Sequence, residues 1–441
     1  MRNNDIESSL KRFLKRKVKI TLGVVVAFLI TGVVGYGGDI VAEGKNQVYT
    51  ENEVSTGKPK IIGGWNYTEG ITTNVDHSNS NTSITLTSGT VDELIGGNHL
   101  KDRGNIKKAG YEAKIGDTSV TMKGGTVQYL IGGSKSNGAN AKITNGKTKV
   151  LVTDGTIGDS RPSVVNAALI GGNYIKATKG EGESITAISD GTDVEITGGT
   201  FRNKVIGGSF AETYGTPVSG LSVEDKETNL KISGGTFDGF VIGGGAAAGT
   251  GNTSTVGTSN LTIKGGIFNS NIYAGGAALE TVTGNGGLGT AKVTNSNLTI
   301  DGTDIINKNL KFDKKLYIYA GGHNSGVSGK ITLTLKNLNQ DMFKEKNGIY
   351  GGSEAAKENI CIEDGDIEIN IFNSYLYADV RGGGEAFGKG SKVKAKNTKI
   401  TVSNTSISGY ENNENTWTGR IFGAGLVQGG ALFEQESTDV V

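Results

Sequence analysis

Short stretches with apolar residues at every second position recur along most of the chain, as at Val194 and Ile196. An alternation with period two buries one face of a β-strand and leaves the other in water. The polar positions between the apolar ones repeat as well. They predict one outward column on stacked strands, made of Thr85, Thr121, Glu195, Lys231, Thr262, Thr299, Thr332 and Thr401.

Pairs of glycines divide the chain into units of similar length. From Gly63 to Gly423 there are ten intervals with an average of 36 residues. Each unit contains the alternating strand, a short second strand such as Leu94-Ile95 that ends on the glycines, and a third run before the next unit. Self-similarity at such a period is typical of solenoids and other repeat architectures. The pairs begin at residues 63, 96, 132, 171, 207, 243, 275, 321, 351 and 382.

Three strands and three corners predict one coil of a solenoid. Stacked coils place apolar side chains in columns and give each strand hydrogen-bonding neighbours above and below. Turns such as Gly198-Gly199 suit the corners, because glycine adopts positive φ without strain. We therefore predict an all-β fold, a right-handed parallel β-helix (β-solenoid) of about ten three-strand rungs, preceded by an N-terminal signal helix. An antiparallel sandwich or a propeller is the alternative, disfavoured because the units keep one register after each Gly pair.

A basic segment followed by an apolar run begins the chain. Residues 1–19 hold seven Lys or Arg residues against Asp5 and Glu7, and the apolar run extends from Ile20 to Val34. This order is typical of a signal peptide, and the run is short for a membrane span. A retained N-terminal anchor is the alternative. The predicted domains are an extended signal peptide (1–42), a polar lead-in (43–60), the β-helix (61–430) and a polar tail (431–441).

Composition narrows the classes of protein further. The chain has 72 Gly but only 3 Pro, and no Gly-X-Y period, which excludes collagen. Its 45 basic residues balance 44 acidic ones, so neither a disordered polyelectrolyte nor a nucleic-acid-binding protein is expected. The single cysteine, Cys361, lies between Ile360 and Ile362 and is expected to be a small buried side chain.

The N-terminal segment carries a resemblance to a known family. Residues 7–21 read ESSLKRFLKRKVKIT and continue into the apolar residues 24–32. This string, about a tenth of the chain, resembles the extended N-terminal segment associated with autotransporters of some anaerobic Gram-negative bacteria. The resemblance implies export by the Sec machinery and a surface-exposed passenger.

Autotransporters also end in a translocating β-barrel of at least eight strands. The last predicted rung lies near Ile421, and the polar tail that follows leaves no room for such a barrel. We expect that an outer-membrane translocator is encoded separately, that the gene is truncated, or that the product is released or periplasmic. The expected localisation is the cell surface or the extracellular space, and the periplasm if no translocator exists.

The segments after the Gly pairs vary most between units. In a solenoid such loops gather along one edge, where they can bind a partner. Their charged and aromatic residues are the candidate contacts with a host protein or glycan, and the alternative is that the loops are merely solvated. The candidate residues are Lys101, Arg103, Tyr174, Phe210, Tyr214 and Phe387.

The sequence offers few candidate residues for catalysis or for binding a metal ion. The best acidic cluster is Glu363-Asp364-Gly365-Asp366, in which both aspartates share a face if the chain is extended. It lacks the spacing of a calcium loop, and a solvated turn is the preferred interpretation. The histidines His77, His99 and His323 lie in different units without partners at metal-ligand spacing. We predict no catalytic residues, no metal and no cofactor.

Three functional hypotheses follow. The leading one is a secreted or surface-displayed passenger-like protein that adheres to a host protein or glycan through the loop edge. The second is a structural spacer or a truncated or split passenger without a ligand. The third is an enzyme that acts on acidic polysaccharides, with Asp364 as the residue to test.

Overall fold

The computed structural model describes residues 39–49, 59–67, 71, 73–101, 111–138, 141–158, 167–178, 185–214, 220–281, 287–303, 310–343, 347–407, 410–412, 415–417, 420–428 and 430–441. Apart from the 3₁₀ turn η1 (Gln340–Met342), their regular elements are β-strands. The predicted signal helix lies outside the described residues.

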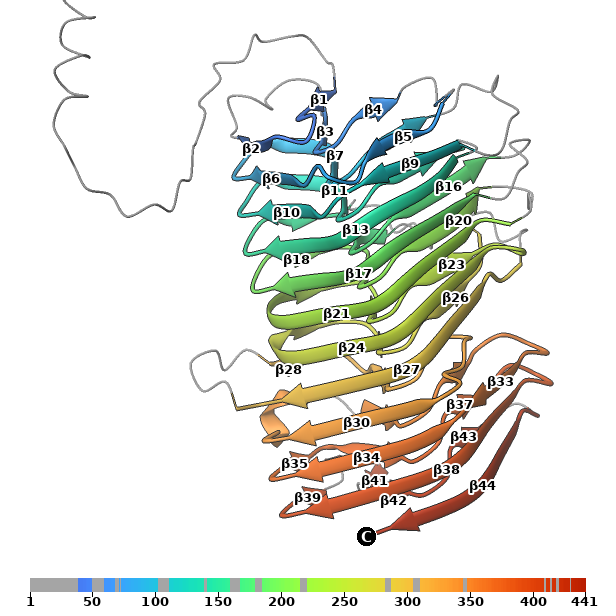
Figure 1. Ribbon diagram of the computed structural model, residues 1–441. Coiled ribbons are helices and arrows are strands. Elements are labelled where there is room, and N and C mark those ends of the chain that lie inside the picture. Colours follow the sequence, from blue (N-terminus) through green and yellow to red (C-terminus); the bar gives the residue numbers. More distant parts are fainter. Residues whose placement is uncertain are drawn as a thin grey trace, which may run out of the picture. The chain divides into compact units, whose positions relative to one another are not determined.

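Parallel strands stack through the whole described part of the chain, as predicted (Figure 1). Every ladder is parallel apart from the short hairpin of β40 (Tyr410–Asn412) and β41 (Asn415–Trp417) within the described residues, which rules out a sandwich or a propeller. The alternating strands form the longest stack. They are β2 (Asn46–Tyr49), β6 (Thr82–Leu86), β10 (Thr118–Met122), β13 (Ala141–Val152), β17 (Thr186–Ile196), β21 (Ser222–Phe237), β24 (Thr253–Phe268), β27 (Thr290–Asp301), β30 (Lys330–Lys336), β34 (Asp366–Phe372), β38 (Lys392–Ser403) and β44 (Leu432–Val440).

The second strands follow the first corner and complete the main core. Their inward side chains, such as Leu94 and Leu130, join those of the alternating strands, such as Ile84 and Val120, in one buried cluster. The second strands are β1 (Ile40–Val41), β3 (Lys60–Ile62), β7 (Thr90–Ile95), β11 (Thr126–Ile131), β15 (Ala167–Ile170), β19 (Lys204–Ile206), β22 (Val241–Ile242), β25 (Ile272–Tyr273), β29 (Tyr317–Tyr319), β31 (Asn347–Tyr350), β36 (Ala378–Arg381) and β42 (Ile421–Phe422).

A further strand follows the Gly pairs, where we expected a loop, except at the pair that begins at residue 321, where His323 forms only isolated bridges. These post-glycine strands form parallel sheets of their own and cover a separate apolar cluster that includes Leu100, Ile175 and Ala211. A rung therefore has more strand segments than the predicted three. The post-glycine strands are β4 (Asn66–Tyr67), β8 (His99–Lys101), β12 (Lys135–Asn137), β16 (Tyr174–Thr178), β20 (Phe210–Tyr214), β23 (Ala246–Ala248), β26 (Ala277–Leu279), β32 (Glu354–Ala355), β37 (Glu385–Ala386) and β43 (Leu426–Val427).

The third predicted run closes each rung. In the first rungs it is a separate strand, as in β5 (Val75–His77) and β9 (Tyr111–Ile115), and β33 (Cys361–Asp364) is again separate. From β13 to β27 it continues without a break into the alternating strand, so that β21 is 16 residues long. The connection that leads into it varies in length: residues 138–140 separate β12 from β13, whereas residues 280–289 separate β26 from β27.

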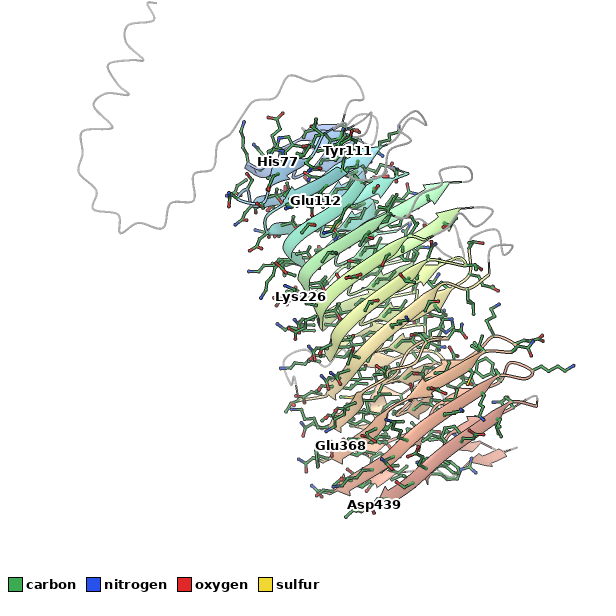
Figure 2. The ribbon with its side chains drawn as sticks, turned by 45° about the vertical axis from the view of Figure 1, so that its right-hand side comes forward. His77, Tyr111, Glu112, Lys226, Glu368 and Asp439 are labelled. Atoms are coloured by element: carbon green, nitrogen blue, oxygen red, sulfur yellow. The ribbon has the colours of Figure 1, made fainter. Side chains whose placement is uncertain are left out.

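The outward column on the alternating strands is largely as predicted. Thr85 pairs with Thr121, and Glu195 pairs with Lys231. In the later rungs Thr334, and not Thr332, pairs with Thr299. Charged side chains also pair across neighbouring strands of this face, as Lys226 does with Asp190 and Lys330 with Glu368. Lys226 and Glu368 lie toward one margin of the stack in Figure 2.

The Gly pairs exist because neighbouring rungs approach each other closely. A Cβ atom at Gly96 would lie 2.1 Å from the carbonyl oxygen of Gly132, and one at Gly132 would lie 2.1 Å from that of Gly171. Backbone atoms of a packed solenoid cannot move aside for a methyl group. Positive φ is needed instead at the first corner, where Gly199 has φ +92°, as expected.

The glycines do not set the register of the rungs. Ile242 pairs with Tyr273, so Gly243 lies over Ala274 and not over Gly275. The expectation of one register after each Gly pair therefore fails at the pairs that begin at residues 275 and 321. The buried side chains before the glycines hold the register, because a one-residue slip would turn each of them to the opposite face.

Buried hydroxyl groups link the alternating strands to the glycine column. Thr82 and Thr118 each donate from Oγ1 to a glycine carbonyl of the same rung, Gly96 and Gly132 respectively, at 2.6 Å. Thr148 and Thr192 repeat the bond. These bonds pair polar groups that are closed off from water.

Phenylalanines form a ladder at the first corner. Neighbouring ring centroids are 4.8–5.7 Å apart along five consecutive rings, and each ring is buried. Stacked rings at this separation add to the free energy gained by burying them. The ladder consists of Phe201, Phe237, Phe268, Phe312 and Phe343.

The solenoid extends beyond both predicted limits. Ile40 and Val41, assigned to the signal segment, pair with Ile61 and Ile62. Residues of the predicted polar tail form β44, which pairs with β38. Cys361 is exposed, so the expectation that it is buried is wrong; Ile362 takes the inward position instead.

Candidate functional site

At the Gly pairs the chain bends from a second strand into a post-glycine strand or, after Gly322, into the isolated bridges of His323. The residue before the glycines and the first residue of the post-glycine strand face each other across this bend, as Ile206 and Phe210 do within one buried cluster. In the stacked rungs these positions form two facing columns of side chains. We use the name bend for these two columns together with the Gly pairs between them. The bend is apolar in its middle rungs and becomes polar toward both ends.

The N-terminal end of the bend holds a buried ion pair. Lys135 Nζ lies 2.6 Å from Glu93 Oε1 and above the rings of Tyr129 and Tyr174. Burial opposes ionisation of Glu93, but Lys135 and Lys60 hold its pKa below the usual value. Burial lowers the pKa of His99 to about 4, so this histidine is neutral at pH 7.

Two of the predicted binding residues belong to this interior. Tyr174 and Phe210 are 3% and 1% exposed, and their rings stack with centroids 5.5 Å apart. The Tyr174 hydroxyl donates to Glu212 Oε2 at 2.5 Å. The expectation that they are surface contacts fails, because both begin post-glycine strands and not loops.

The other predicted binding residues do not come together. Lys101 is exposed at the end of β8, and Phe387 is half-buried after β37, many rungs away. Tyr214 is the last residue of β20. Arg103 lies outside the described residues.

Toward the C-terminal end the bend changes from isoleucine to tyrosine. The rings of Tyr273, Tyr319 and Tyr350 stack with centroids 5.2 and 4.8 Å apart. The Tyr273 hydroxyl donates to Glu354 at 2.8 Å, and the Tyr319 hydroxyl donates to Glu385 at 2.6 Å. Burial, with added repulsion from Glu354, raises the pKa of Tyr273 and of Tyr319 well above the usual value.

Glu385 and Glu354 lie in register on neighbouring strands. Burial raises the pKa of Glu385, and the negative charge of Glu354 acts in the same direction, against the hydrogen bonds from tyrosine hydroxyls. His323 shares the site, because its Nδ1 is hydrogen-bonded to Glu354. The tyrosine ladder therefore ends at two carboxyl groups that are shielded from bulk water.

A pocket of about 250 Å³ opens beside Glu385. Its deep residues, such as Tyr350, Glu385 and Asn347, are almost fully buried, whereas Lys315, Arg420 and Gln428 are exposed. We call it the bend pocket. It is lined by Lys315, Tyr317, Asn347, Gly348, Tyr350, Asp379, Arg381, Glu385, Arg420, Leu426 and Gln428.

Strand register brings these polar groups together. Asp379 and Arg381 alternate with Val380 on β36, so Val380 enters the core while its neighbours face the pocket. Arg420 precedes β42, and Gln428 follows β43 in the same rung. This pocket was not predicted from the sequence. An available signal was the replacement of isoleucine by Tyr273, Tyr319, Tyr350 and Arg381 before successive Gly pairs.

The predicted acidic cluster does not form a second site. Asp364 is 4% exposed and accepts hydrogen bonds from Ser353 N at 2.8 Å, Ser353 Oγ at 2.7 Å and Val327 N at 3.1 Å. Asp366 is exposed and lies on the opposite face. The interpretation of this segment as a solvated turn is wrong for Asp364, whose contacts leave it no access to a substrate.

Within the described residues, no three His, Cys, Asp or Glu side chains are grouped to hold a metal ion. That part of the chain also has no helix with the length and apolar content needed to cross a bilayer. The chain matches no protein-family model, no curated protein and no solved structure.

Proposed function

We propose that the protein is an exported, surface-displayed β-solenoid that adheres to a glycan through the bend pocket. The basic and apolar residues before Gly35 support export, as expected for a signal peptide. The repeat supports a display role, because a solenoid holds one surface in a fixed position over many rungs. The observation that carries the proposal is the bend pocket itself, a recess with buried polar groups.

The make-up of the pocket favours a saccharide over an apolar ligand. Hydroxyl groups of a sugar both donate and accept hydrogen bonds, and the pocket offers acceptors at Asp379 and Glu385 and donors at Asn347 and Arg420. Tyr317 is half-buried at the wall and adds an aromatic surface. A volume of about 250 Å³ is slightly below the usual ~300–1,000 Å³ of drug-sized sites. One sugar unit of a longer chain is therefore a suitable occupant.

Blocking the mouth of the pocket tests the proposal. Gln428 is exposed, so Gln428→Trp should narrow the entrance without disturbing the core. We expect the purified wild-type protein to bind a subset of a glycan array and host cells, and Gln428→Trp to lose most of this binding. Lys396→Trp places the same side chain at an exposed position outside the pocket and should bind as the wild type does.

The alternatives predict different results. If the loop edge binds, Gln428→Trp should be neutral, and shortening the connection between β8 and β9 should abolish adhesion. If the protein is only a spacer, no glycan or cell surface should bind. Either result contradicts the proposed role of the pocket.

A further inference from the structure

The charges around the bend pocket are unequal. Three cationic side chains line it, Lys315, Arg381 and Arg420, against two carboxyl groups, Asp379 and Glu385. The lining therefore has one more positively charged than negatively charged side chain, although the whole chain is nearly neutral.

The two guanidinium groups are held in place. Asp379 Oδ2 lies 3.4 Å from Arg420 Nη2 and 3.7 Å from Arg381 Nη2, so one carboxylate is shared by both. The same guanidinium carbons lie 4.9 and 4.2 Å from the centroid of Phe422. An arginine that is fixed against a ring loses less freedom on binding an anion than a mobile one does.

A buried donor in the pocket has no partner. Asn347 is 1% exposed, and its Oδ1 accepts a hydrogen bond from Leu316 N at 3.0 Å, which directs Nδ2 the other way. This Nδ2 has no hydrogen-bond partner. A buried polar group in that state costs free energy, which a ligand oxygen would recover.

We propose that the bend pocket recognises a carboxylate-bearing sugar unit, such as a uronic acid within an acidic glycan. The arginines provide charge-assisted donors for the carboxylate. Asp379, Glu385 and Gln428 provide acceptors for the hydroxyl groups of the sugar ring. A peptide of acidic residues has no such hydroxyl groups, so these acceptors favour the sugar. This inference rests on the proposed function, since it names the chemical class of glycan for the same pocket.

Calorimetric titration of the full chain tests the inference with three probes: trigalacturonate, its neutral analogue galactotriose, and tri-glutamate. We expect trigalacturonate to bind at least about tenfold more tightly than galactotriose, because the charged contacts are lost with the neutral sugar. The affinity should also fall as salt is added, since part of Arg420 is exposed to solvent.

Arg420→Gln removes the cation at the mouth and keeps a side chain of similar length. We expect it to weaken trigalacturonate binding by about tenfold or more. Lys231→Gln removes one positive charge from the outward face of β21 and should leave binding unchanged. Circular dichroism melting curves of both variants check that each is folded.

The outcomes separate the two proposals. Equal affinity for trigalacturonate and galactotriose would overturn the inference about charge, while the glycan-binding function stands. Unchanged trigalacturonate binding by Arg420→Gln would place the acidic site elsewhere and would also overturn the inference. Tighter binding of tri-glutamate than of any saccharide, or no binding of any glycan, would contradict both the inference and the proposed function.

Discussion

Threonine occupies two columns of this solenoid with opposite surroundings. Thr85 and Thr121 stand half-exposed on the outer face, where β-branched side chains favour the strand. Thr82 and Thr118 lie inside, with their hydroxyls bonded to glycine carbonyls. The same residue type therefore serves strand formation in one column and hydrogen bonding in the other.

The inner column contains its own control. Thr118→Val removes a buried hydrogen bond with little change of shape and should lower the free energy of unfolding by about 1 kcal/mol. Thr228 is equally buried, but its Oγ1 has no partner, so Thr228→Val should be neutral or stabilising. Urea unfolding of both variants, followed by circular dichroism, measures the difference. Equal losses in the two variants would argue against the role assigned to the Thr118 bond.

The alternation of inward and outward positions along the strands was predicted reliably from the sequence. It correctly set the inward positions of Val194 and Ile196. Cys361 was misplaced because the run Ile360-Cys361-Ile362 was taken as wholly buried, whereas strict alternation with Ile362 inward turns Cys361 outward.

At the scale of elements, the phenylalanine ladder adds side-chain contacts between rungs that the parallel backbone ladders already join. Phe237 contacts a ring on each side, and both contacts run between neighbouring rungs. A residue in the middle of such a ladder stabilises three rungs at once. Repeat proteins depend on such nearest-neighbour contacts.

Truncation of Phe237 should therefore be costly. Phe237→Ala leaves a cavity and breaks two stacking contacts, with an expected loss of about 3–5 kcal/mol in the free energy of unfolding. Phe237→Leu keeps most of the volume and should lose less than half of that. Thermal and urea unfolding provide the comparison. Equal stability of the Leu and Ala variants would show that packing volume at this corner matters little.

The lengths of the elements explain why the post-glycine strands were not predicted. The post-glycine strands are two to five residues long, too short for alternation to stand out, and the segments after them differ in length. Leu100, Ile175 and Ala211 nevertheless recur at the second position of these strands and enter one core. Because the post-glycine strands were not predicted, Tyr174 and Phe210 were assigned to loops. The tyrosines before the Gly pairs indicated where the bend changes, but the lining of the bend pocket could not be predicted, because it depends on residues from several rungs in register.

At the scale of the whole molecule, buried carboxyl groups link stability to pH. Burial raises the pKa of Asp364 to about 6, and it raises the pKa of Asp225 as well. Between the ordinary pKa of 3.8 and about 6, the folded state holds the proton of Asp364 while the unfolded state releases it. The contribution of Asp364 to stability therefore decreases as pH rises through this window and is constant above it.

Asp364→Asn should remove this dependence. Relative to the variant, the wild-type protein should lose about 2 kcal/mol of unfolding free energy between pH 4 and pH 6. Asp366→Asn changes an exposed aspartate two residues away and should leave the wild-type slope intact. Urea midpoints at pH 4, 5, 6 and 7 for the three proteins test this. A slope for Asp364→Asn as steep as that of the wild type would contradict it.

The uneven connections between the post-glycine strands and the strands that follow have a consequence for how such a protein can evolve. Three residues suffice between β12 and β13 and ten lie between β26 and β27, yet both pairs of strands keep their places in the parallel ladders. Each doubling of a flexible connection costs only about 0.6 kcal/mol. Insertions and deletions in these connections therefore change the folding free energy little and meet weak selection against them. The residues that the connections expose can diverge between lineages while the rungs stay the same.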